Sequence, residues 1–370
     1  MKKWILIFLL ILCIVRRTEL IYAEESAGDF MDLYDFSAVD RQAETQTGKY
    51  TFSEMVKTFA SGDLSAFGTQ IKENTGNYLF GELKYHRSAF LKIVMLAVLS
   101  ALFSNVSIIL NKPEISETGF FITYLLVVTI LMGAFSMMSD LLLEVTENIT
   151  AFMETAIPAL ALSAGLCCGQ ATALGFGEIA LFIIYAGEKI IKIIILPMIK
   201  LYVVIMSVNH LLSEDYLSKF GNILKTFVLW FLKGFTAVVM GINLIKGMIL
   251  PGLDFAGKNT AAKLVNLLPG GEELTTAGNI FLSSAAVVKN AIGTTAVFIL
   301  FAIILVPMIK MFAFVITYKI MAALIQPVAD KRLAGCVDCT AESVLLLNKV
   351  LITQFVMLTL SVALLCLVTN

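Results

Sequence analysis

The chain has 370 residues, of which 58% are hydrophobic and only 15% are charged. Its mean hydropathy is +0.88, whereas charged residues alone make up about a quarter of an average soluble domain. So much apolar surface cannot be buried in one aqueous core, so the composition excludes a soluble globular protein and predicts an all-α, polytopic bundle of membrane helices. The formal net charge of −1 provides no basic surface of the kind that binds nucleic acid.

The first residues predict a signal peptide. The basic start Met1–Lys3 precedes the apolar run Trp4–Val15, which is shorter than the roughly 20 residues that a membrane span needs. This pattern predicts a signal peptide over residues 1–23, cleaved after Ala23. An uncleaved N-terminal anchor is the alternative, and in both cases the next segment is expected to be exported.

Residues 24–87 form the only long polar stretch of the chain. They predict a small, exported, helical extramembrane segment. Within it, Phe52, Met55, Val56 and Phe59 recur at helical spacing, with Ser53 beside them as a candidate N-cap.

Residues 88–370 predict a polytopic transmembrane domain of about seven or eight spanning helices. Glycines are expected to break the segment Ile157–Gly187. The segment Ile280–Val328 is too long for one span and is expected to supply two spans that meet near Pro307. The apolar segments are Phe90–Leu110, Gly119–Met138, Ile157–Gly187, Ile190–Leu212, Thr226–Leu250, Ile280–Val328 and Val350–Val368.

Two segments between these spans are more polar. Ser139–Thr155 is acidic and amphipathic, so we expect it to lie at the membrane interface or beside the bundle. Pro251–Asn279 contains several glycines and is expected to be a polar connection.

Ionisable residues inside the apolar segments predict a polar path. A charge at the centre of a bilayer costs roughly 2.5 kcal/mol or more, so such residues tend to face the bundle interior or a water-filled cavity. For any single residue, snorkelling to the interface is the alternative. Glu188 and Lys192 are four residues apart and are expected to pair. The candidates for the path are Glu178, Glu188, Lys192, Lys200, Lys233, Lys246, Lys289 and Lys310.

Two features concern helix packing and kinks. The sequence Pro-Met-Ile-Lys occurs at Pro197 and again at Pro307. It is either a trace of the internal repeats found in transporters or a chance likeness of two proline-kinked helices. Gly165 and Gly169, near Ala161, provide the small-residue spacing that allows close helix packing.

Motifs for enzymatic chemistry are incomplete. Gly252–Asn259 resembles a phosphate-binding loop, but Asn259 occupies the position of the hydroxyl residue that would bind magnesium. Cys336 and Cys339 form a single CxxC pair, which is too few ligands for a structural zinc site and leaves a redox role or a local disulfide open. We therefore expect that this chain is not an enzyme and that it binds no metal, cofactor or nucleotide.

Several segments resemble the stage III sporulation protein AE family of endospore-forming bacteria. The most specific are Ala261–Leu274, with its Pro-Gly turn, and Ser283–Gly293, which ends in Lys-Asn-Ala-Ile-Gly. Val306–Lys310, Tyr318–Val328 and the exported Phe52–Gly62 also resemble the family.

This resemblance implies that the chain is a multi-pass membrane component of the channel apparatus between mother cell and forespore. It also implies that the chain lies in the mother-cell membrane that faces the forespore. Members of the family work beside other membrane proteins, including a secretion-type ATPase and a forespore partner, and are needed for forespore development. The family provides no catalytic residues to carry over. The alternative function is a stand-alone secondary transporter, or permease, for a small solute.

Overall fold

A computed structural model describes residues 36–47, 51–60, 88–103, 105–106, 109, 113–168, 170–212, 214–265 and 271–368. These residues form helices and contain no strand. A shorter apolar helix covers Ser88–Phe103. The labelled helices are α3 (Ser37–Thr47), α4 (Phe52–Ala60), α6 (Pro113–Cys168), α7 (Gln170–Ile190), the π-helical turn η1 (Ile191–Ile195), α8 (Leu196–Leu211), α9 (Ser218–Val265), α10 (Gly271–Ile325) and α11 (Lys331–Val368).

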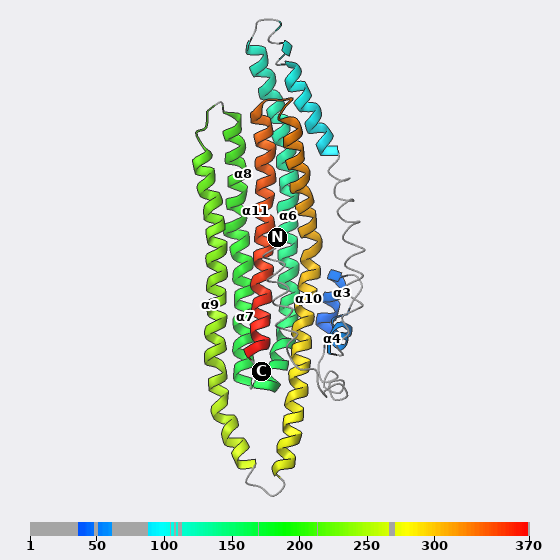
Figure 1. Cartoon of the computed structure of the whole chain (residues 1–370), viewed down its shortest axis with the longest axis vertical. Helices are drawn as coiled ribbons and strands as arrows, with labels where there is room; N and C mark the ends of the chain where they lie inside the picture. The colour runs from blue at the N-terminus through cyan, green and yellow to red at the C-terminus, as the bar shows by residue number, and fades with distance from the viewer. Residues whose placement is uncertain are drawn as a thin grey trace.

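The long helices lie side by side and alternate in direction along the chain (Figure 1). Helices α6, α9 and α11 run down the view, whereas α10 and the continuous unit α7–η1–α8 run up it. The turns from α8 to α9 and from α10 to α11 therefore lie at the same end of the bundle. This up-and-down arrangement confirms the predicted all-α bundle.

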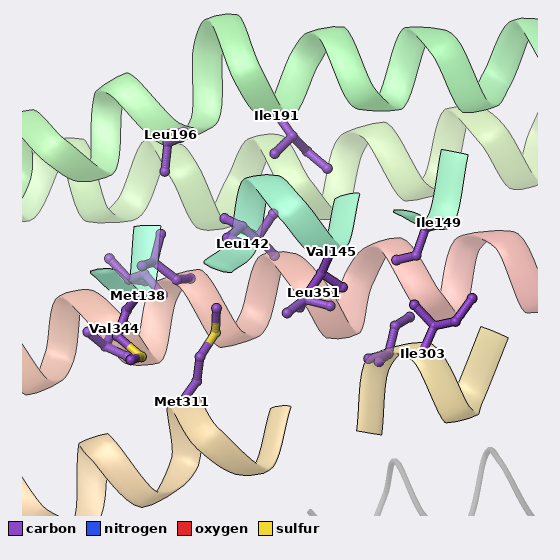
Figure 2. Packing of buried hydrophobic residues seen from close by; sticks show 14 of the residues in the cluster. Met138, Leu142, Val145, Ile149, Ile191, Leu196, Ile303, Met311, Val344 and Leu351 are labelled. Carbon is purple, nitrogen blue, oxygen red and sulfur yellow. The ribbon is translucent and has the colours of Figure 1, made fainter. Parts of the chain in front are cut away.

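Helix α11 is the central element, because it packs against α6, α8, α9 and α10. Figure 2 shows how the core is built around it: Leu142 and Val145 of α6 point toward Leu351 of α11, with Ile191 of η1 and Ile303 of α10 on either side. Helix α9 has the smallest buried share among the long apolar helices and lies at the edge of the bundle.

Five of the described helical stretches are long and apolar enough to cross a membrane. They are Glu114–Gly165, Gly177–Leu211, Ser218–Ile245, Ala285–Ile325 and Lys331–Ala363. Helix α6 has 56 residues, or about 84 Å at 1.5 Å per residue, against a hydrocarbon core about 30 Å thick. Part of α6 therefore extends beyond the hydrocarbon core.

Several boundaries differ from those read in the sequence. Pro251–Val265 continues α9, and Gly271–Asn279 opens α10, so most of the expected polar connection is helical. Residues 280–325 form part of one helix with Pro307 inside it, rather than two spans. Ser139–Thr155 is the middle of α6. Packing on neighbouring helices outweighs the local preference of Gly, Pro and polar residues for turns.

The expected break within Ile157–Gly187 is present, because α6 and α7 run in opposite directions (Figure 1). In contrast, the expected gap between Gly187 and Ile190 is absent, since one helical unit runs from Gln170 to Leu211. The signal peptide predicted for residues 1–23 lies outside the described residues.

Helix α4 has the buried face that its spacing predicts. Phe52, Met55 and Val56 are fully buried, and the Phe52 ring lies 6.4 Å from that of Phe152 on α6. The Phe59 ring lies 5.7 Å from that of Phe298 on α10. Helix α4 is thus attached to the long helices α6 and α10 through aromatic contacts.

The start of α4 is capped differently from the sequence prediction. Thr51, rather than Ser53, is the N-cap, because its Oγ1 accepts a hydrogen bond from the Glu54 backbone N–H at 3.4 Å. Ser53 is itself bound by Asp40 of α3, whose carboxylate accepts bonds from the Ser53 backbone N–H at 2.7 Å and hydroxyl at 2.9 Å.

Candidate functional site

The π-helical turn η1 interrupts the helix formed by α7 and α8. The Leu196 N–H donates to the Ile191 carbonyl, five residues earlier, and Pro197 follows at the start of α8. Proline has no N–H, and its ring clashes with the carbonyl four residues before it in a regular α-helix. The wider turn accommodates this proline, and such turns are frequent at functional sites.

Lys192 lies within this turn and joins two carboxylates. Its Nζ lies 2.6 Å from Glu188 Oε1 on α7 and 2.9 Å from Glu147 Oε1 on α6. The Glu188 side chain is 13% exposed and that of Glu147 is 60% exposed. Because a buried carboxylate is costly unless it is paired, Lys192 neutralises Glu188 where α7 meets α6. We call these three residues the charge cluster.

A buried polar contact lies on the neighbouring face of α6. Thr146 donates from Oγ1 to Gln354 Oε1 of α11 at 3.2 Å, and both side chains are buried. Thr150, one turn further on, donates to the Thr146 carbonyl at 3.0 Å. Around residues 146–150, helix α6 is therefore fixed by polar contacts both to the π turn and to the central helix.

A second group of polar contacts lies near the turn end of the bundle. Glu342 of α11 accepts from Lys225 of α9 at 2.6 Å and from Tyr202 of α8 at 3.2 Å. Lys319 of α10 pairs with Asp338 at 2.7 Å. The first turns of α11 thus connect three other helices.

Capping interactions order the two turns at this end. Hydrogen bonds from Asn209 and Ser218 hold the pKa of Asp215 below its usual value. Burial would raise the pKa of Asp330, but hydrogen bonds from the side chain and backbone of Arg332, with its positive charge, lower it overall. Both carboxylates are therefore ionised acceptors at the start of a descending helix.

The predicted polar path is only partly brought together. Glu188 and Lys192 pair, as their spacing predicts. Glu178, Lys200 and Lys233 lie exposed on the outside of the bundle, whereas Lys310 is half-buried. The side chain of Lys246 lies outside the described part of the structure.

Lys289 has a different environment from the rest of this set. Its side chain is fully buried in α10, and Nζ donates to the backbone carbonyl of Cys366 at 3.1 Å. The carbonyls in the last turn of a helix have no partner within the helix. Lys289 therefore satisfies an acceptor near the end of α11 and complements the negative end of its dipole.

One of the two predicted packing glycines lies within the described part of the chain. Gly165 lies near the end of α6, and Gly169 is outside the described residues. A methyl group added to Gly177 of α7 would lie 3.3 Å from the Ala161 side chain, so these helices approach closely. Pro307 lies inside continuous α10, without the π turn that precedes Pro197.

The motifs considered for enzymatic chemistry are helical. Gly252–Asn259 lies within α9 rather than in a phosphate-binding loop. Cys336 and Cys339 are buried, free thiols on α11, and Cys336 lies 3.7 Å from the Ser207 hydroxyl. Within the described residues, no group of three His, Cys, Asp or Glu side chains could hold a metal ion.

Sequence reasoning missed Glu147, Glu342 and Asp338 as partners of the lysines. Glu147 belongs to the acidic segment that was expected at the interface, and its distance from Lys192 depends on how α6 packs on α7. The only signal in the sequence is that α6 contains acidic residues and no Lys or Arg between Pro113 and Cys168.

Long apolar helices connected by a few ion pairs define a helical bundle of the membrane-protein class. The family model described as Stage III sporulation protein AE matches residues 50–369, and the chain belongs to this family. Stage III sporulation protein AE of Bacillus subtilis (strain 168) is 22% identical over 289 residues, covering 78% of this chain and 72% of that protein. No solved structure matches the chain.

Proposed function

We propose that this chain is a multi-pass subunit of the channel apparatus between mother cell and forespore, needed for forespore development. The observation that supports this proposal most strongly is the family match over residues 50–369, which covers the five long apolar stretches found among the described residues. The subunit lies in the mother-cell membrane facing the forespore. It forms, gates or scaffolds a passage rather than catalysing a reaction.

We assign this role to the charge cluster, which joins Glu188 and Lys192 of the predicted polar path to Glu147. Glu147, Glu188 and Lys192 lie where α6 meets the π turn, so a change in their pairing would alter the packing of α6 on α7. The partners are other membrane proteins of the apparatus, including a secretion-type ATPase and a forespore protein. Energy from ATP enters through that ATPase, because Gly252–Asn259 is part of a helix in this chain.

A deletion strain complemented from compartment-specific promoters tests this function. We expect the deletion to lose heat-resistant spores and forespore integrity, and expression in the mother cell alone to restore both. Normal sporulation of the deletion strain would overturn the proposal, and rescue only from the forespore would contradict the assigned membrane. Transport of a solute by the purified chain in liposomes under an ion gradient would favour the permease alternative.

A further inference from the structure

One face of α6 presents carboxylates to the surroundings of the bundle. Gly133, Ser136, Asp140, Glu144 and Glu147 are spaced by three or four residues and are all exposed, so they share one side of the helix. We call these residues the α6 acidic face. A methyl group added to Gly133 would meet nothing within 4 Å, so its small-residue end is open to an approaching side chain.

Among the described residues, only part of the charge on this face is paired. Glu147 pairs with Lys192. Among the residues that the structure describes, neither Asp140 nor Glu144 takes part in an ion pair. Within the described part of the chain, these two carboxylates therefore lack the counterion that Glu147 has.

Helix α9, at the edge of the bundle, has an outward face that carries a lysine instead of carboxylates. Ile223, Phe227, Trp230, Lys233 and Gly234 lie on one side of the helix and are exposed, with Trp230 at 70%. We call these residues the α9 outer face. Lys233 forms no ion pair within the described residues, and a methyl group added to Gly234 would meet nothing within 4 Å.

Two contacts fix the depth of α9 against the central helix. Lys225 pairs with Glu342, 117 residues further along the chain. Asn243 donates to Ser361, 118 residues further along. The two offsets agree to within one residue, and α9 and α11 run in the same direction (Figure 1). Lys233 is therefore level with about residue 350 of α11.

The contact between Thr146 and Gln354 fixes the depth of α6 against α11 in the same way, because the two residues are 208 positions apart in the chain. Residue 350 of α11 is accordingly level with about residue 142 of α6. Lys233 thus lies at a depth between Asp140 and Glu144, about 3 Å along the helix axis from each. By the same offsets, Phe227 is level with Ser136, and Ile223 is within one residue of the level of Gly133.

We propose that the α9 outer face of one chain docks on the α6 acidic face of a second copy of the same chain. Copies inserted the same way in a membrane are related by rotation about the membrane normal, which keeps depth unchanged. Side-by-side docking therefore places Lys233 between Asp140 and Glu144, which form no ion pair with any described residue, and places Ile223 and Phe227 near the levels of Gly133 and Ser136.

Because the two faces differ, the contact is head-to-tail and generates a ring when the rotation closes. Lys233 and the α6 acidic face would then lie between copies instead of on an outer surface. This proposal concerns self-association and does not depend on the sporulation role, so either can fail without the other.

Cysteine cross-linking in membranes tests the contact directly. In a background without native cysteines, Lys233→Cys and Glu144→Cys chains are oxidised separately and as a mixture. We expect a covalent dimer in the mixture, at least about tenfold above either chain alone. Dimers of Glu144→Cys with itself, or no dimer in the mixture, would overturn the proposal.

Charge exchange in the chain with its native cysteines provides an independent measurement. Lys233→Glu should shift the detergent-solubilised protein from oligomer to monomer in light scattering, and adding Asp140→Lys with Glu144→Lys should restore the oligomer. Lys200→Glu, an exposed lysine on α8, is the matched control and should leave the mass unchanged. A monomeric wild-type protein, or a Lys233→Glu variant of unchanged mass, would contradict head-to-tail docking.

Discussion

The Lys289 ammonium of α10 donates a hydrogen bond to the Cys366 backbone carbonyl of α11 over 3.1 Å. Lys289 opens the Lys-Asn-Ala-Ile-Gly segment and Gly293 ends it. A methyl group added to Gly293 would lie 2.3 Å from Cys366 Sγ. The segment therefore holds the last turns of α11 against α10 with a polar contact at one end and a close approach at the other.

Replacing Lys289 should loosen the end of α11. Lys289→Met keeps the length of the side chain but removes the donor, and a hydrogen bond that involves a charged group contributes about 1.5–3 kcal/mol. We expect thiol labelling of Cys366, followed by mass spectrometry of its peptide, to become at least about tenfold faster. Lys289→Arg, which keeps a donor, should label at nearly the wild-type rate, and equal rates for Met and Arg variants would refute the capping role.

Gly293 should not accept a larger residue while Cys366 is present. Gly293→Ala overpacks the contact of α10 with α11, which typically costs about 1–3 kcal/mol, and we expect lower thermal stability in detergent. The double variant with Cys366→Ala removes the sulfur atom that the methyl group would meet, so it should recover most of the loss. No recovery in the double variant would show that another contact limits this position.

Variants of the charge cluster should lose stability in proportion to how deeply the affected carboxylate is buried. Lys192→Met leaves the Glu188 carboxylate, whose side chain is 13% exposed, without a counterion, and should lower the free energy of unfolding by about 1–3 kcal/mol. Glu147→Gln removes a carboxylate that is 60% exposed and should cost less than about 1 kcal/mol. Reversible unfolding in detergent measures the free energy of unfolding of both variants. A larger loss of this free energy for Glu147→Gln than for Lys192→Met would contradict the expected order.

Asp330 should make stability depend on pH. Its folded-state pKa is lowered, so its stabilising contribution is fully present above the unfolded pKa of about 4 and is lost as pH falls through the folded value. Asp330→Asn should therefore lower the melting temperature at pH 7, with a difference from wild type that shrinks below about pH 4. A difference that stays constant between pH 7 and pH 3 would argue against this role of the carboxylate.

The sequence predicted features that depend on one helix, but not those that depend on two. Helical spacing alone identifies the buried face of α4 at Phe52, Met55 and Val56, and the pairing of Glu188 with Lys192. The third member, Glu147, is supplied by the packing of α6 on α7, which no local pattern encodes.

The number and limits of the helices were harder to predict for a related reason. Glycines, prolines and polar residues in Pro251–Asn279 favour a connection locally, yet α9 and α10 extend into most of this segment. Similarly, Pro307 was expected to separate two spans, but α10 continues through it. In a bundle of long helices, contacts with neighbours maintain helical structure that single-residue propensities disfavour.

We propose above that this chain belongs to a passage between mother cell and forespore, and such a passage should let small molecules cross. The most direct measurement follows a small fluorescent tracer, released in the mother cell after engulfment, as it appears in forespores with intact membranes. We predict that the tracer enters wild-type forespores, and that its entry is lost in the deletion strain and restored by the wild-type chain expressed in the mother cell. Equal entry in the wild-type and deletion strains would contradict the claim.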